Sequence, residues 1–128
     1  MTSALVVDDN VQNLRVLVQL LARQGVQSTE VADPRKLVGA EGSVAAVDVV
    51  FLDLEMPGMN GYQVKELLKP HLGDVPIIAY TVHANEINAV REAGFDGLLG
   101  KPLDKSRFPE QLARIMRRES VWERNLDD

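Results

Sequence analysis

Short apolar runs alternate along this chain with longer segments whose apolar residues recur every three or four positions. Continuous apolar runs are typical of parallel strands covered on both faces, and the longer segments are typical of amphipathic helices. The apolar runs are Ala4–Val7, Val47–Leu52, Ile77–Tyr80 and Leu98–Leu99, and the more polar Gln27–Val31 is predicted to be an edge strand. This alternation predicts an α/β fold with a five-stranded parallel sheet, right-handed crossovers and helices on both faces.

Five helical patterns separate and follow these strands. They span Val11–Leu21, a segment starting at Asp33-Pro34, Val64–Leu68, Ile87–Ala93 and Phe108–Met116. The third pattern is predicted to stop before Pro70, because proline disrupts a helix interior. One domain is expected over residues 1–120. Residues 121–128 are predicted to be a tail that frays or, through Trp122, extends the last helix.

Composition excludes several classes of protein. The 14 basic and 19 acidic residues give a net charge of −5, which argues against nucleic acid as the direct ligand. With no cysteine, neither a disulfide nor a thiolate metal site can form. No apolar run is long enough to span a membrane, and the first residues do not resemble a secretion signal. A cytoplasmic location is therefore expected.

Polar side chains follow four of the predicted strands at the points where these strands end. Asp8 and Asp9 follow the first strand, Asp53 ends the third, Thr81 follows the fourth, and Lys101 follows the fifth. Each residue alone could be a helix cap or a turn former. In parallel α/β sheets, however, ligands bind outside the carboxyl ends of the strands, where all of these side chains are expected to meet.

Three converging carboxylates repel one another and require a cation. Lys101 supplies one positive charge, and Mg²⁺ is the divalent ion that best suits carboxylate and phosphate oxygens. A carboxylate beside that ion is a plausible nucleophile toward phosphorus, which would give an acyl phosphate. The sequence therefore predicts phosphoryl chemistry at Asp53, with Thr81 and Lys101 contacting the transferred group.

Four ordered motifs resemble the receiver domain of two-component response regulators, of the single-domain CheY-like type. The motifs are VVDDN at residues 6–10, FLDLEMPGMNG at 51–61, PIIAYTVHA at 76–84 and Lys101-Pro102. The resemblance implies a flavodoxin-like doubly wound fold with the strand order 2-1-3-4-5. It also implies that a histidine kinase or a histidine phosphotransfer protein donates a phosphoryl group to Asp53.

The resemblance further implies a role for each matching residue. Asp8 and Asp9 would bind Mg²⁺ together with Asp53 and the backbone carbonyl of Glu55. Thr81 and Lys101 would bind the phosphoryl oxygens. The peptide bond between Lys101 and Pro102 would be cis.

Four positions near these motifs are expected to modulate the switch. Leu98 stands where many receivers carry an aromatic residue, which puts the common coupling between threonine and that residue in doubt. Val82 is bulkier than the alanine or glycine usual at its position and would crowd phosphoryl access. Glu55 and His83 are predicted to set the lifetime of the acyl phosphate by shaping the path of the attacking water.

The leading hypothesis is a stand-alone receiver that switches protein contacts and is not an enzyme beyond its own phosphorylation and slow autodephosphorylation. Its downstream target is expected on the face of the fourth helix, fifth strand and fifth helix, and homodimerisation there stays open. One alternative is a degenerate receiver that acts as a phosphorylation-independent scaffold. A less favoured alternative is a phosphatase of the haloacid dehalogenase type, whose Asp-x-Asp pattern differs from the adjacent Asp8 and Asp9.

Overall fold

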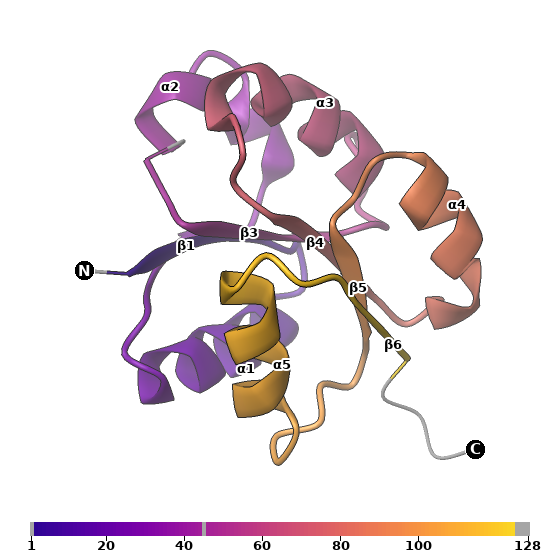
Figure 1. Cartoon of the computed structure of the whole chain (residues 1–128). Coiled ribbons are helices and arrows are strands. Elements are labelled where there is room, and N and C mark those ends of the chain that lie inside the picture. The colour runs from indigo at the N-terminus through magenta and orange to yellow at the C-terminus, as the bar shows by residue number, and fades with distance from the viewer. Residues whose placement is uncertain (1, 45, 125–128) are drawn as a thin grey trace.

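The computed structural model describes residues 2–44 and 46–124 and contains a parallel sheet with helices on both faces (Figure 1). The strands are β1 (Ser3–Val7), β2 (Gln27–Val31), β3 (Val49–Asp53), β4 (Ile77–Thr81), β5 (Gly97–Gly100) and β6 (Val121–Glu123). The α-helices are α1 (Val11–Arg23), α2 (Glu41–Val44), α3 (Gly61–Leu72), α4 (Ile87–Glu92) and α5 (Phe108–Met116), with 3₁₀ turns at Pro34–Leu37 and Ala84–Glu86. Strand order is β2-β1-β3-β4-β5-β6, so the doubly wound, flavodoxin-like fold is confirmed and one further strand is added.

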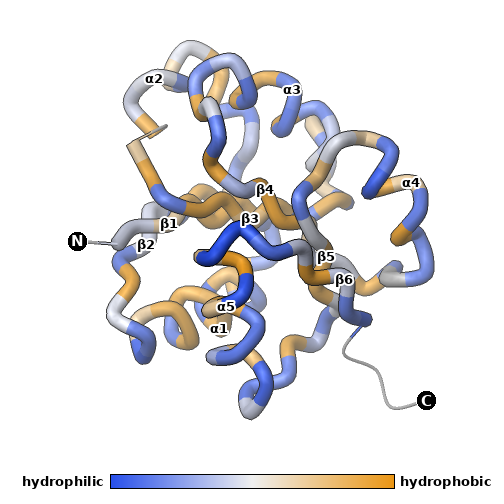
Figure 2. The backbone as a smooth tube through the Cα atoms, viewed as in Figure 1, coloured by the Kyte–Doolittle hydropathy of each residue, from blue (hydrophilic) through white to orange (hydrophobic). Residues whose placement is uncertain are grey.

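Each face of the sheet has its own apolar core. Ala4 and Val6 of β1 face α1 and α5, whereas Leu5 and Val7 of the same strand face the side of α3 and α4. Apolar colour follows the strands in Figure 2, and hydrophilic colour predominates on much of α3 and α4. β2 is the polar edge strand that was predicted. Burial on both faces explains why the central strands are continuous apolar runs.

The predicted C-terminal tail is wrong for residues 121–123, which form β6 alongside β5. Helix α5 ends at Met116, and the chain then turns through Arg118, which has a φ of 66°. Val121 is fully buried, and Trp122 packs against the α3/α4 core instead of continuing the helix. Residues 125–128 of the predicted tail lie outside the described residues.

Two helix predictions also need correction. Helix α3 continues through Pro70 to Leu72: the proline removes one hydrogen bond of the last turn, but buried Leu68 and Leu72 hold that turn against the core. The segment after Asp33 forms a 3₁₀ turn and the separate short α2 instead of one helix.

Capping interactions fix the two loops that carry the acidic side chains. Asn10 caps α1 by accepting a hydrogen bond from the backbone N–H of Asn13 at 3.1 Å. Asn60 forms a capping box with Gln63 at the start of α3. A Cβ atom at Gly61 would overlap the carbonyl oxygen of Asp53, so glycine allows α3 to begin directly against the end of β3. Across residues 2–44 and 46–124, no helix combines the length and apolarity that a membrane crossing requires.

Candidate functional site

Pairing of the strands brings the predicted site residues to one edge of the sheet. β1, β3, β4 and β5 are consecutive parallel neighbours, so their carboxyl ends lie side by side. Asp8, Asp53 and Thr81 are buried there, whereas Asp9 is exposed. The ammonium group of Lys101 reaches back to the two buried carboxylates.

Asp8 is fully buried and holds three hydrogen bonds. Its Oδ1 accepts from the backbone N–H of Asn10 at 2.9 Å. Its Oδ2 accepts from the Tyr80 hydroxyl at 2.8 Å and from Lys101 Nζ at 3.0 Å. Buried charge is tolerated only with such partners, and these donors fix the orientation of the Asp8 carboxylate.

Asp53 shares the same lysine. Its Oδ1 lies 3.1 Å from Lys101 Nζ and 3.5 Å from the backbone nitrogen of Glu55. Burial raises the pKa of Asp53 to about 7, Lys101 opposes that rise, and the negative charge of Asp8 adds to it. One lysine therefore does not compensate both buried acids, and the pocket favours additional positive charge.

The structure offers three oxygen ligands for such a charge. Carboxylate oxygens of Asp8, Asp9 and Asp53 lie within 4.8 Å of one another. A set made only of carboxylate oxygens suits a hard divalent cation such as Mg²⁺, which also retains water and accepts phosphate oxygens. The residues present therefore fit the predicted ion.

Thr81 and Lys101 are linked through the backbone at the ends of β4 and β5. Lys101 N–H donates to the Thr81 carbonyl at 2.8 Å, and Thr81 Oγ1 accepts from the His83 N–H at 3.0 Å. The peptide bond between Lys101 and Pro102 is cis. These contacts hold the hydroxyl and the ammonium on neighbouring strands at the edge where the acids meet.

The four predicted modulators occupy different environments. His83 Nε2 lies 3.0 Å from Glu55 Oε2, and both side chains are at least half exposed, at 50% and 61%. This pair joins the loop after β3 to the loop after β4. Val82 is exposed, whereas Leu98 is fully buried in the core beneath α3 and α4.

Tyr80 is a site residue that sequence reasoning missed. Its ring belongs to the α1/α5 core, its hydroxyl reaches Asp8, and Lys101 Nζ lies 4.4 Å from the ring centroid. Burial, followed by the charge of Asp8, raises the pKa of Tyr80, so the hydroxyl remains a proton donor. The sequence did contain a signal for this role, because Tyr80 ends an apolar run. A tyrosine hydroxyl that is buried with such a run requires a hydrogen-bond partner.

Comparison with known proteins agrees with this geometry. Residues 4–113 match the family model for the response regulator receiver domain. The sensory transduction protein RegX3 of Mycobacterium tuberculosis is 36% identical over 121 residues, covering 92% of this chain and 52% of RegX3. Sensor protein GacS of Pseudomonas syringae is 33% identical over 127 residues, covering 88% of this chain and 13% of GacS. The chain thus spans about half the length of RegX3 and a small part of GacS.

Solved structures show the same fold. The receiver domain of sensor histidine kinase PA1611 from Pseudomonas aeruginosa, which has a magnesium ion coordinated in its active site cleft, is 30% identical with a TM-score of 0.72. That match covers 94% of this chain and 96% of the other. Chemotaxis protein CheY4 of Vibrio cholerae is 24% identical with a TM-score of 0.78, covering 90% of this chain and 98% of the other. From the motif order, the acidic site and the family match, this chain belongs to the response regulator receiver family.

Proposed function

We propose that this chain accepts a phosphoryl group on Asp53 in a Mg²⁺-dependent reaction and then changes its contacts with other proteins. The carrying observation is that Lys101 Nζ lies 3.0 Å from Asp8 and 3.1 Å from Asp53, in a pocket where three carboxylates converge. Such a pocket supplies a nucleophile together with positive charge for a phosphoryl group. Receiver domains are signalling domains, so we assign no turnover of a separate substrate.

The proposed donor is a phosphohistidine on a histidine kinase or a phosphotransfer protein. An Asp53 carboxylate oxygen forms the new bond to phosphorus, and the bond between phosphorus and the histidine nitrogen breaks with its electrons returning to that nitrogen. Mg²⁺ held by Asp8, Asp9, Asp53 and the Glu55 carbonyl would supply positive charge to the phosphoryl oxygens. We place the reaction in the cytoplasm, where ATP supplies such kinases.

The chain's own polar groups then hold the product. Lys101 exchanges its contact with ionised Asp53 for a phosphoryl oxygen while Asp8 remains bonded to Tyr80 and Asn10. The Thr81 hydroxyl donates a hydrogen bond to a second phosphoryl oxygen. Thr81 precedes the segment that leads to α4, and Lys101 directly follows β5 and precedes α5, so the proposed output surface is the face of α4, β5 and α5. Homodimerisation through that face is part of the same proposal.

The pair formed by Glu55 and His83 is the proposed control on acyl phosphate lifetime. It bridges the loops after β3 and β4. In this proposal, a water molecule that attacks the phosphoryl group would pass this pair, and Val82, which is exposed, would narrow the same approach.

Incubation with Mg²⁺ and acetyl phosphate, followed by intact-mass measurement, tests the function directly. We expect a single phosphoryl adduct that Asp53→Asn abolishes and that EDTA prevents. Asp74→Asn, at an exposed acid before β4 on the opposite edge of the sheet, should leave the adduct unchanged. No adduct on the folded chain would support the scaffold alternative, and steady turnover of an aryl phosphate would support the phosphatase alternative.

A further inference from the structure

The β5 edge of the proposed output face already carries a strand of this chain. β6 pairs parallel with β5, with Gly97 opposite Val121, Leu98 opposite Trp122 and Leu99 opposite Glu123. It lies between α4 and α5 (Figure 1). The edge of β5 therefore already holds an extended segment, and we refer to the surface that β6 covers, along β5, as the groove along β5.

Two glycines allow the close approach of that segment. A Cβ atom at Gly97 would lie 2.7 Å from the carbonyl oxygen of Val121. A Cβ atom at Gly100 would overlap the carbonyl of Arg124. Side chains at either end of β5 would therefore push the paired strand away.

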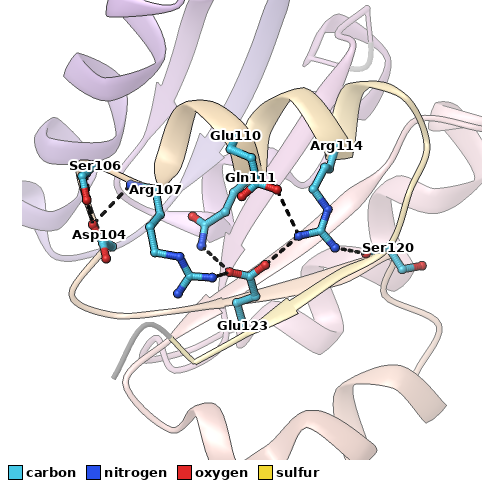
Figure 3. A network of polar contacts seen from close by, with 8 residues as sticks. All are labelled: Asp104, Ser106, Arg107, Glu110, Gln111, Arg114, Ser120 and Glu123. Atoms are coloured by element: carbon cyan, nitrogen blue, oxygen red, sulfur yellow. Dashed lines mark hydrogen bonds and ion pairs between the residues drawn. The ribbon is translucent and has the colours of Figure 1, made fainter. Parts of the chain in front are cut away.

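Glu123 is anchored by polar groups of α5 and the residue before it (Figure 3). Its carboxylate pairs with Arg107, accepts from Gln111 Nε2 at 2.9 Å and accepts from Arg114 NH1 at 2.8 Å. Arg114 also lies 3.4 Å from Glu110 and 3.9 Å from Glu119. The Glu123 side chain is only 16% exposed, so the groove contains a defined receptor for a carboxylate.

Trp122 fills the opposite side of the strand. Its side chain packs against the α3/α4 core, and the Arg91 guanidinium of α4 lies 4.7 Å from the ring. A cation over an aromatic face contributes attraction in addition to the buried apolar area. The groove therefore recognises an aromatic side chain on one face and an acidic one on the other.

We propose that the groove along β5, between α4 and α5, is a docking site for an extended partner segment with an aromatic residue followed by an acid, and that β6 is its resident occupant. A partner strand would pair with the β5 backbone and place its two side chains as Trp122 and Glu123 are placed now. Strand addition with alternating side-chain pockets is an established mode of peptide recognition. The segment that holds this position is short, and it follows a turn whose Arg118 is in the left-handed region.

This proposal rests on the proposed output face of α4, β5 and α5 and adds the kind of partner that the face binds. Its test does not require phosphoryl transfer. The probe is a labelled peptide with the sequence of residues 120–124, Ser-Val-Trp-Glu-Arg, read by fluorescence anisotropy without Mg²⁺ or phosphodonor. A matched peptide carries alanine and glutamine in place of the tryptophan and the glutamate. If the peptide does not bind, the proposal that Asp53 is phosphorylated is unaffected. If Asp53 is not phosphorylated, the proposal of a docking site along β5 is unaffected.

The full chain is compared with a Trp122→Ala/Glu123→Gln variant, in which the resident strand has lost both anchors. Because a tethered occupant competes at an effective concentration on the order of millimolar, we expect the variant to bind the peptide at least about tenfold more tightly than the unaltered chain. Glu30→Gln, at an exposed acid of β2 on the opposite edge of the sheet, should bind like the unaltered chain. Adding Arg114→Ala to the double variant should weaken binding again.

Folding of each variant is checked by circular dichroism and cooperative urea unfolding, and Glu123→Gln alone replaces the double variant if the latter unfolds. Trp122 is the sole tryptophan of the chain, so its fluorescence reports on the resident strand. A peptide that carries phenylalanine in place of tryptophan should displace that strand and so increase the quenching of Trp122 fluorescence by acrylamide. Equal binding of the two labelled peptides, or no gain in the folded variant, would overturn the proposal.

Discussion

Substitution of Asp53 by asparagine should stabilise the metal-free protein at neutral and alkaline pH. Asp53 is 6% exposed, and its carboxylate lies beside the buried Asp8 carboxylate. Its folded pKa is about 7, against 3.8 for the unperturbed group. The folded chain therefore binds a proton at Asp53 more tightly than the unfolded chain does. Stability contributed by that proton is present at acidic pH and is lost as pH rises through about 7.

The size of the effect follows from the two pKa values. The interval between 3.8 and about 7, at about 1.4 kcal/mol per pH unit, corresponds to about 4 kcal/mol when Asp53 is fully ionised. Asparagine keeps the shape of the neutral side chain but loses the charge that attracts Lys101. We therefore expect a gain in unfolding free energy of about 2–4 kcal/mol at about pH 8, falling toward zero near pH 4.

Urea unfolding in EDTA, followed by circular dichroism at several pH values, measures this difference. Added Mg²⁺ should raise the stability of the unaltered chain and have a smaller effect on Asp53→Asn, because the ion compensates the same carboxylates. Asp74→Asn serves as the matched control at an exposed acid and should behave like the unaltered chain. If Asp53→Asn is no more stable than the unaltered chain at about pH 8 in EDTA, the account of an undercompensated acid pair is refuted.

Three further substitutions test other parts of the site. Tyr80→Phe removes the hydroxyl that donates to buried Asp8 and should cost about 1–3 kcal/mol in urea unfolding; a cost below about 0.5 kcal/mol would contradict this role. Gly61→Ala places a methyl group against the backbone at the end of β3 and should cost about 1–3 kcal/mol, measured in the same way. Glu55→Ala and His83→Ala should each change the rate of acyl phosphate loss, followed by intact mass, by more than about twofold. Rates within twofold would remove this pair from the control of lifetime.

The sequence predicted the edge at which the site forms because that prediction rests on strand order and burial. Asp8, Asp53 and Lys101 each follow an apolar run, and parallel strands have to place such residues together. The spacing of the apolar runs was sufficient to predict which edge of the sheet carries the site, but it does not predict which side chains contact one another. The shared bond of Lys101 to both acids is a result of the structure.

The features that were missed depend on tertiary packing. Trp122 falls at a helical spacing from Phe108 and Ile115, so periodicity could not distinguish a longer helix from a chain that turns back. The left-handed residue of the turn is Arg118 and not a glycine, so the sequence carries no turn signal at this position. Tyr80 was read as a strand residue, because whether its hydroxyl reaches Asp8 depends on the relative positions of β1 and β4, which are separated by β3.

The sixth strand also bears on self-association through the edge of the sheet. β5 is a fully buried run of Gly97-Leu98-Leu99-Gly100 with little side chain at either end. Bare edges of this kind pair readily with other chains and lead to aggregation. β6 covers that edge with a strand that ends at Glu123 and is followed by exposed Arg124. A chain cut at residue 120, the boundary expected from the sequence, would keep its acidic site and lose its protection against self-association.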